Sequence, residues 1–131
     1  MPLVFIYGSL LPGEPNHGFL EGARFVRKGR TQRGVGLVKA GPYPSLTFAE
    51  RARGERRATL ADAHVSGEIY DVDDALLASL DEFEGHPDLY RRSELVLEDG
   101  TTVMAWALPA EEADAWPIVA TEAWRDRRQS S

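Results

Sequence analysis

The sequence predicts a single α+β domain over residues 1–131, arranged as a small mixed β-barrel with flanking helices. Two observations predict this class. Six or seven short segments have the composition of strands, and one segment, after Asp73, has a strong helical period. This order lacks the regular strand and helix alternation of a doubly wound sheet. The length suits one hydrophobic core and is too short for two ordinary domains.

The first half of the chain is expected to consist mostly of strands. Residues 4–7 form a continuous β-branched and aromatic run that stops at Gly8, which indicates a buried strand followed by a tight loop. Residues 41–44 contain one glycine and two prolines and predict a turn. Alternating apolar and polar residues predict three further strands, at 23–33, 35–39 and 45–48.

Residues 50–57 are rich in charge and contain four arginines. We expect them to form a solvated loop whose arginines face water. The alternative is an anion-binding patch, or an interaction surface for another molecule. Binding through such a surface would weaken sharply with salt, because mobile ions screen exposed charges.

A strand and a helix are expected next. Residues 65–72 alternate between the two faces of a strand. Asp73 is a suitable helix N-cap, and the helical period covers residues 75–83. Gly85 and Pro87 follow directly and end the predicted helix.

A hairpin and a less regular segment complete the chain. Asp99-Gly100 is a frequent hairpin turn. Residues 111–127 could begin as a helix that Pro117 interrupts, and residues 129–131 are expected to fray. The two strands of the hairpin are expected at 90–97 and 102–108.

Composition argues against several classes of partner. Apolar residues make up 43% and charged residues 27%, as in ordinary globular proteins. A net charge of −6 repels phosphate backbones and anionic membranes, so neither nucleic acid nor a membrane is an expected partner. The chain has no cysteine, and its three histidines lack metal-ligand spacing, so we expect no zinc site. Without a signal peptide or a membrane-length apolar run, a cytoplasmic protein is expected.

The predicted helix carries a carboxylate on its apolar face. At about 100° per residue, Glu84 falls within the apolar stripe, whereas Asp81 lies at its edge and Glu82 faces solvent. Burial and the negative end of the helix dipole both raise the pKa of an inward carboxyl group, which suits a general base near neutral pH. The alternative is that the helix frays at Gly85 and Glu84 turns to water. The stripe consists of Leu76, Leu77, Leu80 and Phe83.

Small residues follow the first strand. Gly8 and Ser9 lie in a turn where consecutive backbone N–H groups can point at one anion, and a carboxylate would suit such a site. The segment lacks the Lys-Ser/Thr pair of a P-loop and the flanking glycines of a hydrolase nucleophile elbow. A plain turn, with glycines present for backbone reasons, is the alternative.

Three segments, in this order and spacing, resemble the γ-glutamylcyclotransferase superfamily. They are Tyr7-Gly8-Ser9-Leu10 with Gly13 and Asn16, Gly67-Glu68-Ile69-Tyr70, and Asp81-Glu82-Phe83-Glu84-Gly85 followed by Tyr90-Arg91-Arg92. The resemblance covers residue 3 to about residue 108. The segment Gly13-Glu14-Pro15-Asn16-His17 is most similar to the AIG2-like, γ-glutamylamine cyclotransferase branch.

The resemblance implies an enzyme that cyclises a γ-glutamyl amide or peptide to 5-oxoproline and releases the free amine. Glu84 would be the catalytic acid/base, with neither metal nor cofactor. Backbone N–H groups of residues 8–10 would hold the γ-glutamyl group, with Tyr7 and Tyr90 beside it, while Arg92 either touches substrate or braces the helix. The substrate-binding residues so implied are Tyr7, Gly8, Ser9, Leu10, Tyr90 and Arg92.

The mechanism implied by the resemblance depends on proximity. The substrate's own α-amine attacks the γ-carbonyl group, and effective molarities of such intramolecular reactions reach roughly 10⁵ M or more. Glu84 would take up a proton from the amine and return it to the departing nitrogen. The first alternative is a non-catalytic domain of this fold that binds a small γ-glutamyl or amino-acid ligand. Neither the leaving amine nor the oligomeric state follows from the sequence.

Overall fold

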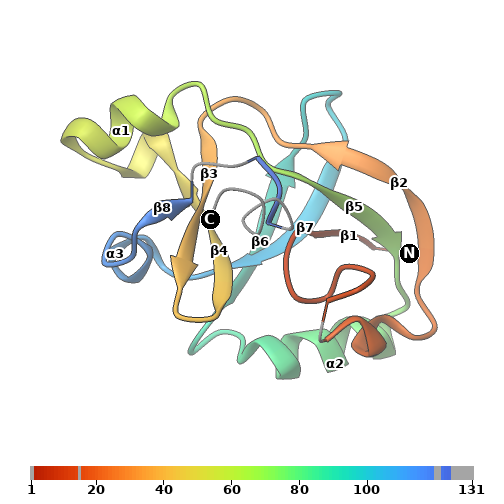
Figure 1. The fold of residues 1–131 in the computed structure, drawn as a ribbon. Helices are drawn as coiled ribbons and strands as arrows, with labels where there is room; N and C mark the ends of the chain where they lie inside the picture. The colour runs from red at the N-terminus through yellow and green to blue at the C-terminus, as the bar shows by residue number, and fades with distance from the viewer. Residues whose placement is uncertain (1, 15, 120–121, 125–131) are drawn as a thin grey trace.

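A five-stranded mixed sheet forms the centre of the molecule (Figure 1), in a computed structural model that describes residues 2–14, 16–119 and 122–124. The strand order is β2-β5-β1-β7-β6. Strand β1 pairs antiparallel with β5 and parallel with β7, and the two outer pairs are antiparallel. The strands are β1 Leu3–Ile6, β2 Arg24–Arg30, β5 Ser66–Asp71, β6 Arg91–Val96 and β7 Thr102–Ala107.

A second, three-stranded sheet packs on the first. In this sheet β3 (Val35–Ala40) lies between β4 (Tyr43–Phe48) and the short β8 (Ile118–Val119). Apolar side chains of both sheets form one buried core between them. Its members include Phe5, Leu37, Leu46 and Val103.

The five-stranded sheet curls but does not close into a complete barrel. Its edge strands meet at an isolated bridge between Thr31 and Leu97, and the N–H of Glu98 donates to the carbonyl oxygen of Arg30 at 3.0 Å. In the described part of the chain this contact does not extend into a ladder between β2 and β6. The mixed α+β class is therefore confirmed, whereas the predicted barrel is only loosely realised.

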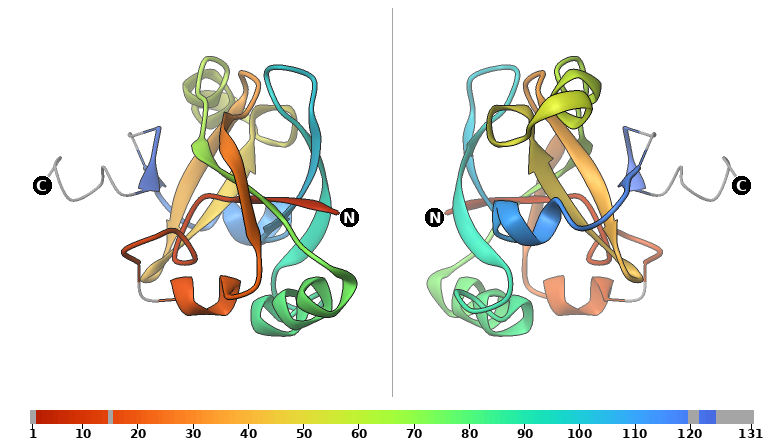
Figure 2. Two further views of the ribbon diagram at one scale, coloured as in Figure 1. Left: turned by 90° about the vertical axis from the view of Figure 1, so that its right-hand side faces the viewer. Right: turned by 90° about the vertical axis from the view of Figure 1, so that its left-hand side faces the viewer.

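Helix α2 (Asp74–Glu84) covers the other face of the central sheet (Figure 2). Successive side chains of a strand point to opposite faces, so Val4 packs toward α2 while Phe5 enters the core between the sheets. The Asp73 side chain accepts the N–H of Leu76 at 2.7 Å and caps the start of α2. Both ends of this helix lie within one residue of the prediction.

Residues 50–57 contain helical segments, which corrects the predicted loop, whereas the prediction that the arginines face water is confirmed for the exposed Arg51, Arg53 and Arg57. Residues 50–51 belong to the 3-10 helix Ala49–Arg51 and residues 54–57 to α1 (Gly54–Leu60), with residues 52–53 between the two helices. Leu60 is completely buried and anchors α1, and Arg56 donates to the carbonyl oxygen of Trp116 at 3.0 Å. A helix of seven residues with a single buried side chain has no clear apolar period, so the sequence pattern missed it.

The other differences lie at segment ends. Tyr43 and Pro44 belong to β4, so the turn before this strand is shorter than predicted. The helix predicted from residue 111 is the four-residue α3 (Ala110–Ala113), and after Pro117 the chain enters β8. The predicted fraying of residues 129–131 lies outside the described residues. No helix among the described residues combines the length and the apolar character needed to cross a bilayer.

Candidate functional site

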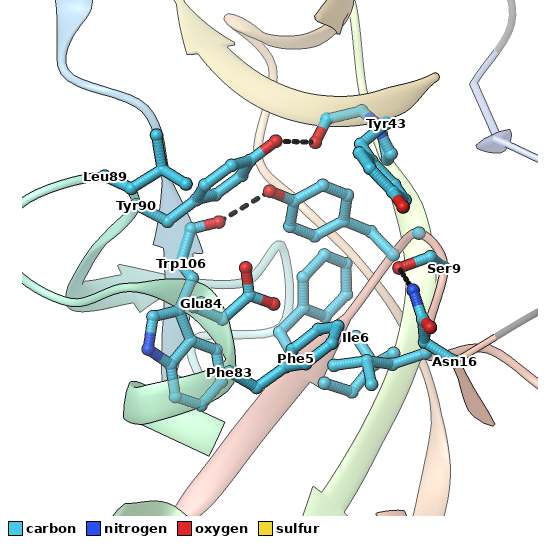
Figure 3. A pocket seen from close by; sticks show the side chains of 14 residues that line it. Phe5, Ile6, Ser9, Asn16, Tyr43, Phe83, Glu84, Leu89, Tyr90 and Trp106 are labelled. Carbon is cyan, nitrogen blue, oxygen red and sulfur yellow. Dashed lines mark hydrogen bonds between the residues drawn. The ribbon is translucent and has the colours of Figure 1, made fainter. Parts of the chain in front are cut away.

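A pocket of about 260 Å³ lies where the loop after β1, the start of β4 and the end of α2 meet (Figure 3). Buried side chains of β1 and β7 form its inner wall. Segments far apart in the sequence therefore converge on one cavity. Six of the predicted site residues line it: Tyr7, Gly8, Ser9, Leu10, Glu84 and Tyr90.

The loop after β1 is fixed through its carbonyl groups. The carbonyl oxygens of Gly8 and Ser9 accept backbone N–H groups at 3.0 and 2.9 Å, and that of Leu10 lies 2.8 Å from Nδ1 of His17. The backbone N–H groups of residues 8–10 donate to no other group in the described part of the chain. A run of such donors favours an anion as the acceptor.

Close packing requires glycine at position 8. A Cβ atom on Gly8 would lie 2.5 Å from Cγ of Pro44, far inside van der Waals contact. The hydroxyl of Ser9 accepts a hydrogen bond from Nδ2 of Asn16 at 3.0 Å, so its contact is within the loop. The floor of the pocket is therefore shaped by backbone and small side chains.

Glu84 is the last residue of α2, and its carboxyl group points into the pocket (Figure 3). The helix does not fray before it, because Gly85 ends the helix in the left-handed conformation and the N–H of Tyr90 donates to the carbonyl oxygen of Glu84 at 3.1 Å. No described residue donates a hydrogen bond to the carboxylate. Burial raises the pKa of Glu84 to about 7.

Two tyrosines lie beside this carboxyl group. The hydroxyl of Tyr7 donates to the carbonyl oxygen of Trp106, and that of Tyr90 donates to the carbonyl oxygen of Pro44 at 2.8 Å. Burial raises the pKa of both phenols, and the negative charge of Glu84 raises it further. Both hydroxyls therefore stay protonated at neutral pH.

Arg92 does not line the pocket. Its guanidinium group donates to Oδ2 of Asp81 at 2.7 Å, and Nε1 of Trp106 donates to Oδ1 of the same carboxylate at 2.9 Å. These bonds join the last turn of α2 to β6 and β7. The guanidinium group of Arg92 is therefore bonded to the helix that carries Glu84.

Several lining residues were missed by the sequence reasoning. Tyr43 and Leu89 lie at the mouth of the pocket, and Phe83 and Trp106 add apolar wall. Tyr43 and Leu89 have no signal that separates them from other apolar residues near turns. Asn16 could have been found, because it belongs to the first segment that carries the resemblance.

The pocket has a specific chemical capacity. Within the described residues, no group of three or more histidine, aspartate or glutamate side chains is placed to hold a metal ion. The pocket does combine backbone donors, two phenols and one carboxyl group that titrates near neutral pH. Such a set can bind an anionic group at the loop and transfer a proton beside it.

Comparison with known proteins gives consistent matches. The family model "Gamma-glutamyl cyclotransferase, AIG2-like" matches residues 4–126. Gamma-glutamylaminecyclotransferase of Homo sapiens is 39% identical over 107 residues, covering 76% of this chain and 65% of that protein. A putative gamma-glutamylcyclotransferase of Drosophila melanogaster is 36% identical over 110 residues, covering 79% of this chain and 66% of that protein. The aligned part thus spans slightly less than two thirds of each relative.

A solved structure agrees with these matches. The crystal structure of an AIG2-like protein from Mus musculus superposes with a TM-score of 0.70 at 30% sequence identity. The superposition covers 92% of this chain and 87% of that chain. The arrangement of two sheets and flanking helices is therefore shared along nearly the whole described chain.

Proposed function

Because this chain belongs to the AIG2-like gamma-glutamyl cyclotransferase family, we propose that its pocket cyclises a γ-glutamyl amide or peptide to 5-oxoproline and releases the free amine. One observation carries the proposal. Glu84, with a pKa of about 7, lines the same pocket as residues 8–10, whose backbone N–H groups donate to no other group in the described part of the chain. A proton-transfer group and an anion-binding loop thus lie in the same cavity.

In the proposed reaction the backbone N–H groups of residues 8–10 hold the γ-glutamyl group. The α-amine nitrogen attacks the γ-carbonyl carbon, and a C–N bond forms within the substrate. Donors of the loop stabilise the resulting oxyanion, an effect worth about 3–4 kcal/mol per donor in comparable sites. Glu84 accepts a proton from the attacking nitrogen and donates it to the departing nitrogen, and the original C–N bond breaks.

Replacement of Glu84 tests this proposal. In the Glu84→Gln variant we expect the rate of 5-oxoproline release to fall by about 10²–10⁴-fold. Mass spectrometry measures this release over a panel of γ-glutamyl compounds. The matched control is Glu82→Gln, because Glu82 is an exposed carboxylate on the same turn. A folded Glu84→Gln protein with nearly wild-type turnover would remove Glu84 from the mechanism.

Replacement of Ser9 separates backbone from side-chain binding. The Ser9 hydroxyl already accepts a hydrogen bond from the Asn16 side chain. The Ser9→Ala variant is therefore expected to lose much less activity than Glu84→Gln. An equally large loss of activity would indicate that the Ser9 hydroxyl itself binds the substrate. If the wild-type protein binds the γ-glutamyl compounds and forms no 5-oxoproline, the non-catalytic alternative is the correct one.

A further inference from the structure

The mouth of the pocket is apolar. Of the 14 lining residues, two are exposed, Tyr43 at 50% and Leu89 at 54%. Tyr43 begins β4, and Leu89 lies between α2 and β6. Figure 3 shows these side chains on two sides of the pocket. These two exposed residues therefore mark where the pocket meets solvent.

Backbone hydrogen bonds and strand pairing position both residues of the mouth. Tyr43 pairs with Ala40 across the two-residue turn that joins β3 to β4. The N–H of Leu89 donates to the carbonyl oxygen of Gly85 at 2.8 Å, next to the cap of α2. The backbone at both residues is thus fixed before a ligand arrives, which reduces the ordering cost of binding.

Charge in the pocket disfavours a second carboxylate on the substrate. Of the 14 lining residues, all in the described chain, none is lysine, arginine or histidine, and Glu84 is the one acidic side chain. Lys39, the cross-strand partner of Pro44, is exposed and does not line the cavity. A carboxylate next to the departing nitrogen would meet ionised Glu84 without a compensating cation, and such a charge is costly in a partly desolvated site.

We infer that this pocket selects γ-glutamyl conjugates of apolar primary amines, with Tyr43 and Leu89 as the side chains that contact the departing amine. The inference rests on the proposed cyclisation. Ring closure takes place in the interior beside Glu84, so the substituent of the departing nitrogen extends to the mouth. There an alkyl or aryl group covers the exposed surfaces of Tyr43 and Leu89. Covering half of one such side chain corresponds to about tenfold in affinity.

Three substrates test the selectivity. N-γ-glutamylphenethylamine and γ-glutamylphenylalanine differ by one carboxylate, and N-γ-glutamylmethylamine lacks the aryl group. Their kcat/KM values are measured from 5-oxoproline release. The phenethylamine conjugate is expected to exceed each of the other two by tenfold or more. Equal values for the three would overturn the inference and leave the cyclisation standing, as would 5-oxoproline released only from other γ-glutamyl compounds of the panel. No 5-oxoproline from any compound of the panel would overturn the proposed function and the inference together.

Variants of the mouth assign the selectivity to residues. Tyr43→Ala and Leu89→Ala are each expected to lower the phenethylamine to methylamine ratio of kcat/KM by about tenfold. Leu89→Arg adds a cation and is expected to raise the phenylalanine to phenethylamine ratio by about tenfold. Val96→Ala removes an apolar side chain of similar exposure, 45%, outside the pocket, and serves as the matched control. Ratios that do not change in the folded mouth variants would overturn the assignment.

Discussion

Replacing Glu84 by glutamine is expected to stabilise the protein at neutral and alkaline pH, although it removes the proposed catalytic group. The carboxyl group of Glu84 has a pKa of about 7 in the folded protein, against 4.5 for an ordinary glutamate. Burial is the cause, because the folded state disfavours the charged form. Glutamine has a similar shape and no charge, so it avoids this penalty.

The sign and size of the effect follow from proton linkage. Between pH 4.5 and about 7 the folded protein holds a proton that the unfolded chain has released, so the free energy of unfolding decreases as pH rises through this window. At about 1.4 kcal/mol per pKa unit the full loss is about 3 kcal/mol. Residual solvent contact of the carboxyl group makes this loss smaller. We therefore expect the wild type to lose about 1–3 kcal/mol of its free energy of unfolding above pH 7 and none below pH 4.5.

Urea unfolding at pH 4.5, 6 and 8 measures this difference. The free energy of unfolding of Glu84→Gln minus that of the wild type should be smallest at pH 4.5 and larger by about 1–3 kcal/mol at pH 8. Glu82→Gln, on the exposed side of the same turn, should follow the wild type at each pH. If Glu84→Gln also runs parallel to the wild type, the carboxyl group is not desolvated and the reasoning about its pKa is wrong.

Three further predictions concern the pocket and its supports. The wild-type kcat/KM is expected to rise about tenfold per pH unit on the acid side and to level off above about pH 7 as Glu84 ionises, which a pH-rate profile measures. Gly8→Ala is expected to lower kcat/KM more than tenfold and stability by about 1–3 kcal/mol, in kinetics and urea unfolding, because the new Cβ would lie 2.5 Å from Pro44 Cγ. Asp81→Ala leaves two donors without their acceptor and is expected to cost about 1–2 kcal/mol in urea unfolding.

Local signals made helix α2 and the placement of its carboxylate predictable. Asp73 caps the helix and Gly85 ends it, and the apolar period places Glu84 on the inner face. These signals act between residues within one helical turn, so they can be read from the sequence before the fold is known. The prediction of an inward-facing carboxylate therefore needed only the helix and its apolar stripe, whereas the pocket was implied by the family resemblance.

Contacts between distant segments could not be predicted in the same way. The two residues of β8 form a strand only because β3 supplies their partners. Tyr43 and Leu89 line the same mouth although 46 positions separate them in the sequence. Gly8 could be assigned to a turn, but its need for glycine comes from the approach of Pro44 on the second sheet. Each of these features depends on the packing of two segments, and neither segment contains a sequence signal for its contact with the other.

Burial raises the free energy of ionised Glu84 in the pocket above its free energy in water. When Glu84 is ionised, this difference favours a movement of the end of α2 toward solvent. Groups around the carboxylate oppose this movement. Gly85 caps the helix, the N–H of Tyr90 holds the Glu84 carbonyl oxygen, and Asp81 joins the turn to β6 and β7. A salt bridge made directly to Glu84 would relieve the desolvation, but it would lower the pKa and remove the base. Restraint of the backbone and of the preceding turn fixes Glu84 while leaving its carboxyl group able to exchange a proton.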